Sequence, residues 1–286
     1  MTTEELLKRV RRIEIKTRAQ TSGVFAGEYH SAFKGRGMAF AEVREYQVGD
    51  DVRDIDWNVT ARTGRPHIKV YEEERELCVM LLIDVSRSLD FGTQQRSMRD
   101  LTTEIAATLA FSAIQNNDKI GVVFFSDHIE KFIPPGKGRR HILRIVREMI
   151  DYKPESSRTD IGVALEYLMH VMNKHCIAFV LSDFLDRKDY SRAMRIAAHK
   201  HEMVAVRVYD RRMAELPDVG LLKVTDAETG HATYIDTASR RVREQQHRWW
   251  LEETDRVQGL FQRCGMRFTD VATDGDYVMA LRHLFK

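Results

Sequence analysis

Two continuous apolar runs lie in the middle of the chain, at residues 77–83 and 177–181. Their length and β-branched members are typical of strands buried on both faces of a parallel sheet. Elsewhere apolar residues recur with helical period, which predicts helices over 95–116, 138–150, 160–173, 190–200, 239–263 and 277–285. Further strands are predicted over 118–126, 203–209 and 266–271, with 129–133 as an antiparallel edge beside the first of these.

The order of these segments predicts the fold class. Strands and helices alternate from residue 76 onward, which is typical of an α/β fold with a doubly wound, mostly parallel sheet and helices on both faces. Residues 1–75 differ, because a basic amphipathic helix over 3–18 is followed by short segments that glycines interrupt. We therefore expect an N-terminal helix and small β-rich elaboration over 1–75. We expect the α/β domain over 76–286, with a hairpin insertion near 221–236 and its turn at 228–230.

Two local predictions concern charged and aromatic residues. The acidic segment 49–57 lacks the ligand spacing of a calcium-binding loop, so it is interpreted as an ion-paired turn with Arg44, Arg53 or Arg62. Trp249 and Trp250 are neighbours in a predicted helix, where adjacent side chains point in different directions. One of the two is therefore expected to be buried and the other partly exposed.

Polar side chains follow both apolar runs. Asp84, Ser86 and Ser88 come directly after the first run, and Asp183 comes directly after Ser182 at the end of the second. Thr159 lies on a polar loop that opens the predicted helix over 160–173. The carboxyl ends of parallel strands are where open α/β sheets hold their ligands. Carboxylate and hydroxyl oxygens suit Mg²⁺ or a similar hard cation.

This pattern resembles the metal-ion-dependent adhesion site of von Willebrand factor type A domains. The resemblance assigns Asp84, Ser86 and Ser88 to the first loop, Thr159 to the second and Asp183 to the third. It implies a bound Mg²⁺, or Mn²⁺ or Ca²⁺. Two carboxylates and three neutral hydroxyls leave a divalent cation incompletely coordinated, so the site could accept an acidic oxygen from a partner protein.

A structural alternative uses the same residues without a metal. The hydroxyls of Ser86, Ser88 and Thr159 could cap the helices that begin after each strand. Asp84 and Asp183 would then accept hydrogen bonds from loop amides.

A second resemblance lies mostly ahead of the first apolar run. The segments GRGM at 35–38, EYQVGD at 45–50, VRDIDW at 52–57, AR at 61–62 and YEEERE at 71–76 carry it. They are similar to a bacterial family of unknown function that has a type A-like domain and is associated with MoxR-type AAA+ ATPases. The resemblance implies an adaptor that works with such an ATPase to assemble or activate other complexes.

Composition narrows the partners and the compartment. The chain has 45 basic and 43 acidic residues, a formal charge of +2, so electrostatics give no case for nucleic acid. The N-terminus has no apolar signal core, and no run approaches the roughly 20 apolar residues of a membrane span. Three widely spaced cysteines, Cys78, Cys176 and Cys264, are expected to be buried free thiols. These features predict a cytoplasmic protein.

The sequence supports an enzymatic function less than it supports a metal-dependent binding function. An aspartyl-phosphate phosphatase needs a second carboxylate two residues after its nucleophile, and Ser86 stands there. No phosphate-binding loop of the G-x-x-x-x-G-K-[ST] type occurs. We therefore expect a binding protein without catalytic residues. The alternative is a Mg²⁺-dependent phosphohydrolase at the same site, with Asp160 or the Asp127–His128 pair as the candidate bases.

Overall fold

The computed structural model describes Lys8, Arg12, Ile13, Tyr29 and residues 38–73, 77–93 and 96–285. The chain divides into two compact units, Met1–Ala32 with Cys78–Lys286, and Phe33–Leu77. Most of the helix predicted over 3–18 lies outside the described residues, as do 35–37, 74–76 and the start of the helix predicted from 95. The predicted domain boundary, between 75 and 76, also falls there.

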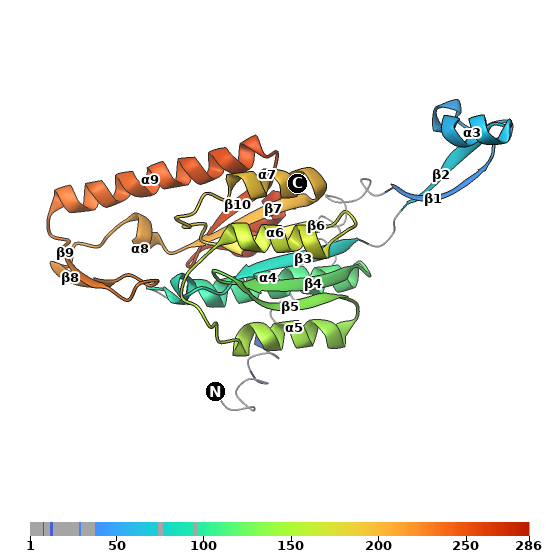
Figure 1. Ribbon diagram of the computed structural model, residues 1–286. Helices are drawn as coiled ribbons and strands as arrows, with labels where there is room; N and C mark the ends of the chain where they lie inside the picture. The colour runs from blue at the N-terminus through green and yellow to red at the C-terminus, as the bar shows by residue number, and fades with distance from the viewer. Residues whose placement is uncertain are drawn as a thin grey trace. The chain divides into compact units, whose positions relative to one another are not determined.

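A mixed sheet forms the centre of the larger unit (Figure 1). Within the described residues it has six strands, which are in spatial order β10 (Arg267–Ala272), β7 (Glu202–Tyr209), β6 (Ile177–Ser182), β3 (Cys78–Asp84), β4 (Lys119–Phe125) and β5 (Ile129–Gly136). All neighbours run parallel except β5, which pairs antiparallel with β4 at one edge. The predicted antiparallel edge is confirmed and is longer than expected.

The strand order fixes where a ligand can lie. The chain builds outward from β3 to β4 and β5, then crosses to the other side of β3 and continues through β6, β7 and β10. The order reverses between β3 and β6, which pair directly with Ile83 opposite Leu181. In doubly wound sheets this switch point leaves a crevice at the carboxyl ends of the two strands. The residues that follow β3 and β6 therefore share that crevice.

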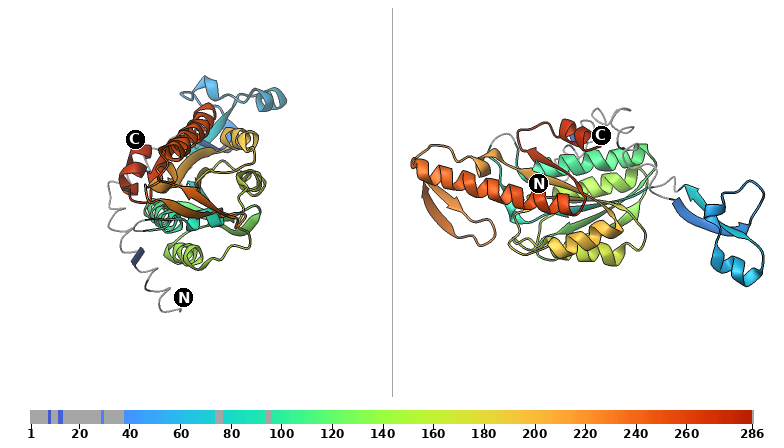
Figure 2. Two further views of the ribbon diagram at one scale, coloured as in Figure 1. Left: turned by 90° about the vertical axis from the view of Figure 1, so that its left-hand side faces the viewer. Right: turned by 90° about the horizontal axis from the view of Figure 1, so that it is seen from above.

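Helices cover both faces of the sheet (Figure 2). They are α4 (Met98–Gln115), α5 (Arg139–Asp151), α6 (Ile161–Val171), α7 (Ser191–Lys200), α8 (Arg211–Ala214), α9 (Arg240–Arg263) and α10 (Tyr277–Phe285). Helices α4 and α10 pack on one face, and α6, α7 and the C-terminal half of α9 pack on the other. This arrangement confirms the doubly wound, mostly parallel α/β fold class predicted from the sequence.

Strand β3 lies at the centre of the core. Its residues from Val79 to Leu82 are fully buried, because helices cover the sheet on both sides. Met80 and Leu82 belong to one continuous apolar cluster with α6, α7 and α9. The cysteines are free thiols as expected, but only Cys176 is buried, whereas Cys78 and Cys264 are partly exposed.

A peripheral hairpin and a long helix complete the larger unit. Strands β8 (Leu221–Thr225) and β9 (Ala232–Asp236) pair antiparallel and precede α9. On α9, Trp250 is 6% exposed and Trp249 is 44% exposed, so the predicted difference between them is confirmed.

The smaller unit contains an antiparallel pair, β1 (Met38–Glu45) and β2 (His67–Glu73). The acidic segment between them is an ion-paired turn, in which Arg44 bonds Asp50 through two nitrogens and Arg53 pairs with Asp51. The sequence interpretation missed helix α3 (Trp57–Thr63), which Asp56 caps at its start and Gly64 ends in a left-handed conformation. Seven residues are too few to give a helical period.

The buried centre of β3 generates a stability prediction. Replacing Leu82 with Ala removes buried methyl groups and leaves a cavity that the packed sheet cannot close, so it should lower the free energy of unfolding by about 2–5 kcal/mol. Urea denaturation measures this change. The matched control is Leu221→Ala on β8, where the side chain is 70% exposed and the expected change stays within about 0.5 kcal/mol. Equal losses in both variants would contradict the assigned core.

Candidate metal centre

Two carboxylates are buried beside each other at the switch point. Asp84 is the last residue of β3, and Asp183 directly follows β6, which pairs with β3. The two residues are only 1% and 2% exposed. Each strand is held in place by apolar packing on both faces, so the sheet fixes the position of both carboxylates.

Hydrogen bonds occupy three of the four carboxylate oxygens. The Ser86 amide donates to Oδ1 of Asp84 at 2.9 Å, and the Ser182 hydroxyl donates to its Oδ2 at 2.6 Å. The Leu185 amide donates to Oδ1 of Asp183 at 3.0 Å. The remaining atom, Oδ2 of Asp183, is buried and accepts no hydrogen bond from the described residues. A buried acceptor without a partner is costly, so this oxygen marks a position suited to a further ligand.

Burial also changes the acidity of the pair. The pKa of Asp84 rises to about 7, chiefly because burial disfavours its charged form and secondly because of the charge of Asp183. Burial likewise raises the pKa of Asp183, although the Leu185 amide and the Ser88 hydroxyl oppose the shift and the nearby Asp186 adds to it. The charged groups that shift these two pKa values most are other carboxylates, Asp183 acting on Asp84 and Asp186 acting on Asp183. A cation between them would supply the missing positive charge.

The third loop holds Asp183 through a constrained backbone. Phe184 adopts a positive φ of 57°, which is unusual for a bulky residue, and its side chain is fully buried. Its amide donates to the Ser182 hydroxyl at 3.0 Å. Such backbone conformations cost on the order of 1–3 kcal/mol and persist only where packing enforces them. The turn at Ser182–Phe184 is therefore a fixed feature of the site.

The first loop brings its two serines together. The Ser86 and Ser88 hydroxyl oxygens lie 3.1 Å apart, at the start of the short 3₁₀ helix η2 (Arg87–Asp90). The Ser182 hydroxyl, from the residue before Asp183, donates to Asp84, so the first and third loops meet. Three of the five predicted residues, Asp84, Ser86 and Ser88, are thus joined by direct hydrogen bonds, and Asp183 directly follows a residue that binds Asp84.

Thr159 lies on a neighbouring loop but makes no hydrogen bond to the other four within the described residues. It is 6% exposed. Its loop is fixed on both sides, because the Arg87 amide donates to the Ser157 carbonyl at 3.3 Å and the Asp160 amide donates to the Ser126 carbonyl at 2.9 Å. The second loop is therefore hydrogen-bonded directly to the first.

The helix-capping alternative explains only part of this arrangement. Ser86 stands at the N-cap position of η2 without a capping hydrogen bond from its side chain. The cap of α6 is Asp160, whose carboxylate accepts from the Val163 amide, and not Thr159. The expected loop-amide bonds to Asp84 and Asp183 are present. The hydroxyls of Ser86 and Thr159 do not cap these helices.

Residues distant in the sequence brace the first loop. Asp210, at the end of β7, accepts from the Thr93 amide at 3.0 Å, from the Thr93 hydroxyl at 2.6 Å and from the Thr273 hydroxyl at 2.8 Å. Burial raises the pKa of Asp210, yet these bonds together hold it below its usual range. Arg99 donates to the backbone carbonyls of Val85 and Ser86. Sequence analysis missed Asp210, whose position after a predicted strand was the available signal.

A second group of possible ligand atoms consists of His128, Glu130 and Glu155. Glu130 already accepts from the Ser126 hydroxyl at 2.7 Å and from the Tyr152 hydroxyl at 2.9 Å. His128 pairs with Asp127 at 2.9 Å. These bonds give Glu130 and His128 a structural role in the segment that leads to Thr159.

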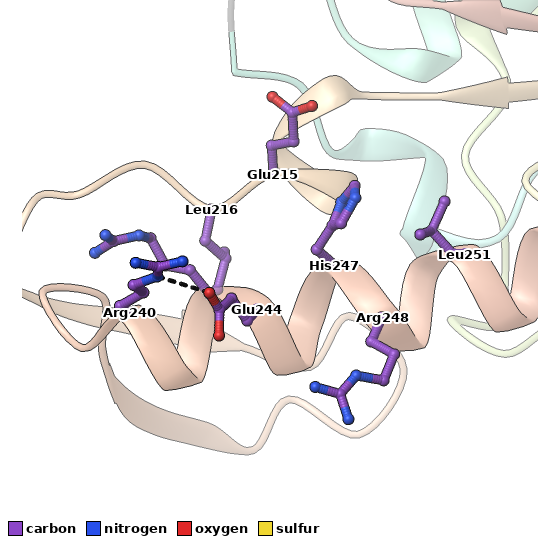
Figure 3. Close-up of a pocket in the computed structure, with 8 residues that line it drawn as sticks. Glu215, Leu216, Arg240, Glu244, His247, Arg248 and Leu251 are labelled. Carbon is purple, nitrogen blue, oxygen red and sulfur yellow. Dashed lines mark hydrogen bonds and ion pairs between the residues drawn. The ribbon is translucent and has the colours of Figure 1, made fainter.

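A separate pocket of about 540 Å³ lies between α8 and the first half of α9 (Figure 3). Arg240, Arg243 and Arg248 line it together with Glu215 and Glu244, and Arg240 pairs with Glu244. None of the five predicted ligand residues lines this pocket.

Comparisons with known proteins identify relatives and a shared fold. Residues 42–255 match the family model described as "Protein of unknown function DUF58". The chain is 33% identical over 279 residues to the uncharacterised protein Rv1480 of Mycobacterium tuberculosis, which covers 96% of this chain and 87% of that protein.

Two solved structures have the same fold. An aerotolerance-related membrane protein from Bacteroides fragilis is similar with a TM-score of 0.52 and 14% identity, covering 73% of this chain and 98% of that one. The conserved hypothetical protein BatB from Bacteroides thetaiotaomicron gives a TM-score of 0.50 and 14% identity, covering 73% and 96%. In the part of this chain that the structure describes, no helix has the length and apolarity needed to cross a bilayer.

The raised pKa of Asp84 predicts how the metal-free protein responds to pH. Between the ordinary value of 3.8 and about 7, the folded protein binds more protons than the unfolded chain, so this group makes the free energy of unfolding fall as pH rises. Asp84→Asn should remove that decline, a difference on the order of 2–3 kcal/mol between about pH 5 and about pH 8.

Urea denaturation in EDTA at the two pH values measures this effect. Asp255→Asn, on the exposed face of α9, removes the same charge and should keep the wild-type pH dependence. An unchanged pH dependence in Asp84→Asn would show that Asp84 is not a buried, destabilising charge.

Proposed function

The chain belongs to the DUF58 family of proteins of unknown function, and we propose that it is a metal-dependent protein interaction module. Asp84, Ser86, Ser88, Thr159 and Asp183 hold a Mg²⁺ ion, or Mn²⁺ or Ca²⁺ in its place. A bound divalent cation supplies a positive charge with open coordination positions. An acidic residue of a partner protein fills one of those positions.

One observation carries the proposal. Oδ2 of Asp183 is a buried carboxylate oxygen without a hydrogen-bond donor among the described residues, and it lies beside a second buried carboxylate. Carboxylate and hydroxyl oxygens are the donor set that hard divalent cations prefer. A bound cation would remove both the repulsion and the unsatisfied acceptor.

The donor set also explains why a partner would be needed. Ser86, Ser88 and Thr159 contribute neutral oxygens, so the protein supplies at most two negative charges. Mg²⁺ demands six ligands in near-octahedral geometry and retains water where the protein offers none. A carboxylate from another molecule can replace one such water, and the metal then bridges the two proteins.

The proposed partner is a MoxR-type AAA+ ATPase or its client, with this chain as a cytoplasmic adaptor in the assembly or activation of other complexes. Support for this partner comes from the sequence resemblance over segments between 35 and 76. The fold supports a binding role, because it gathers carboxylate and hydroxyl oxygens at the carboxyl ends of β3 and β6, where open α/β sheets hold their ligands.

No observation favours the phosphohydrolase alternative. The candidate base Asp160 accepts from the Val163 amide and pairs with Lys188. His128 pairs with Asp127, which raises the pKa of the histidine. Both candidates are engaged in bonds that stabilise the fold around the second loop.

Thermal unfolding with metal tests the proposal. Wild-type protein in Mg²⁺ or Mn²⁺ at about 100 times the dissociation constant should gain about 2.7 kcal/mol of stability relative to protein in EDTA. Asp84→Ala and Asp183→Ala should each lose this gain, because each removes a charged ligand. Differential scanning calorimetry measures the change.

Asp255→Asn serves as the control and should gain stability from metal as the wild type does. A metal-induced gain of equal size in Asp84→Ala would place the cation elsewhere and refute the assignment. Metal-dependent capture of a purified MoxR-type ATPase, abolished by EDTA, would then test the proposed partner.

A further inference from the structure

The β8–β9 hairpin lies at the same end of the larger unit as the metal centre. In the sequence the hairpin follows β7 and α8, and the turn at 226–231 connects its two strands (Figures 1 and 2). The carboxyl end of β3 points toward this end of the unit (Figure 1). The hairpin is therefore placed to interact with whatever occupies the crevice.

Two contacts join the hairpin turn to the site loops. The Ser157 hydroxyl donates to the Glu228 carbonyl at 2.8 Å, and Arg187 pairs with Asp226 at 3.1 Å. Ser157 also accepts from the Arg87 amide, between the two serines of the first loop. Arg187 lies four residues after Asp183. The turn thus contacts both the second and the third loops.

The turn itself has a defined shape. Oδ1 of Asp226 accepts from the amides of Glu228 and Thr229 at 2.9 and 3.0 Å. Gly230 adopts a positive φ of 71°, and its amide donates to the Asp226 carbonyl. These bonds fix the backbone of Glu228 within the turn.

Glu228 adds a further carboxylate to a region that already contains Asp183, Asp186 and Asp226. Its pKa is raised, first by burial and further by the charges of Asp226, Asp186 and Asp183, while Arg187 opposes the shift. The Ser157 hydroxyl that binds the Glu228 carbonyl belongs to a residue two positions before Thr159, so the backbone of Glu228 is joined directly to the second loop. Carboxylates gathered in this way repel one another unless a cation lies among them.

We propose that Glu228 is the chain's own acidic ligand for the cation, and that the hairpin turn fills the coordination position that a partner's carboxylate takes. This inference rests on the proposed metal-binding function and adds its regulation. A partner binds by displacing Glu228, and the hairpin covers the site until then.

The hairpin is built so that its turn can move while its base stays fixed. Its strands contribute little to the core, and Leu221 and Tyr234 are 70% and 64% exposed. At the base, Arg243 of α9 donates to the carbonyls of Thr237 and Ala238. A segment with few buried contacts opens at low free-energy cost. In the part of the chain that the structure describes, the hydrogen bond from Ser157 and the ion pair with Arg187 are the contacts that would break for the turn to leave the site loops.

Mn²⁺ alone is the probe for the test. In full-length wild-type protein, isothermal titration calorimetry gives the Mn²⁺ affinity, and water-proton relaxation gives the number of water molecules on the bound ion. Glu228→Gln should weaken Mn²⁺ binding by about tenfold, since it removes a charged ligand, and should add one bound water molecule. Mg²⁺ should also slow amide hydrogen exchange at 226–231 in the wild type and not in this variant.

The control is Asp236→Asn, which removes one negative charge from the base of the same hairpin and should match the wild type in both measurements. If Glu228→Gln keeps the wild-type affinity and the same number of bound waters, the role of Glu228 is refuted. That result, with Mn²⁺ binding lost in Asp84→Ala, would leave the metal site intact. Absence of Mn²⁺ binding in the wild type would overturn the proposed function and this inference together.

Discussion

The side-by-side burial of Asp84 and Asp183 is the constraint on which the rest of the site depends. Each carboxylate is almost inaccessible to water, and burial raises the pKa of both. An apolar pair would pack there without penalty, so the arrangement costs stability in the free protein. The surrounding loops supply amide and hydroxyl donors to three of the four oxygens and leave one without a partner. Such a loss of stability is common where a protein binds a ligand, which is the role proposed for this pair.

The doubly wound topology makes that arrangement possible. Because the strand order reverses between β3 and β6, two loops separated by about a hundred residues begin at adjacent strand ends. The loops are then braced from outside, by Asp210 on one side and by the Ser157 backbone on the other. Apolar packing sets the positions of the carboxylates, and hydrogen bonds across the sheet edge set the positions of the hydroxyls.

Much of the fold and the centre of the site could be predicted from local sequence patterns. Asp84 ends the apolar run of β3 and Asp183 directly follows β6, so the sequence predicts two carboxylates at one edge of the sheet, and the structure places both there, buried at adjacent strand ends. Helix α3 escaped prediction because it is too short for a period, although Asp56 and Gly64 mark its ends. The contact between Thr93 and Asp210 spans 117 positions, so no local pattern reveals it. The place of Glu228 depends likewise on how the hairpin folds back over the loops.

The attachment of the hairpin to α9 has a consequence for competition between ligands. In the role proposed for Glu228, its carboxylate would compete for the metal at an effective concentration that can reach the millimolar range, because its short tether keeps it nearby. Free acids and weakly held acidic peptides would seldom outcompete it. A partner that also binds the exposed hairpin gains a second contact and can keep the turn away from the metal. Selectivity among acidic proteins would then come from the surface around the crevice, because the metal in the crevice would bind the carboxylate of any of them in the same way.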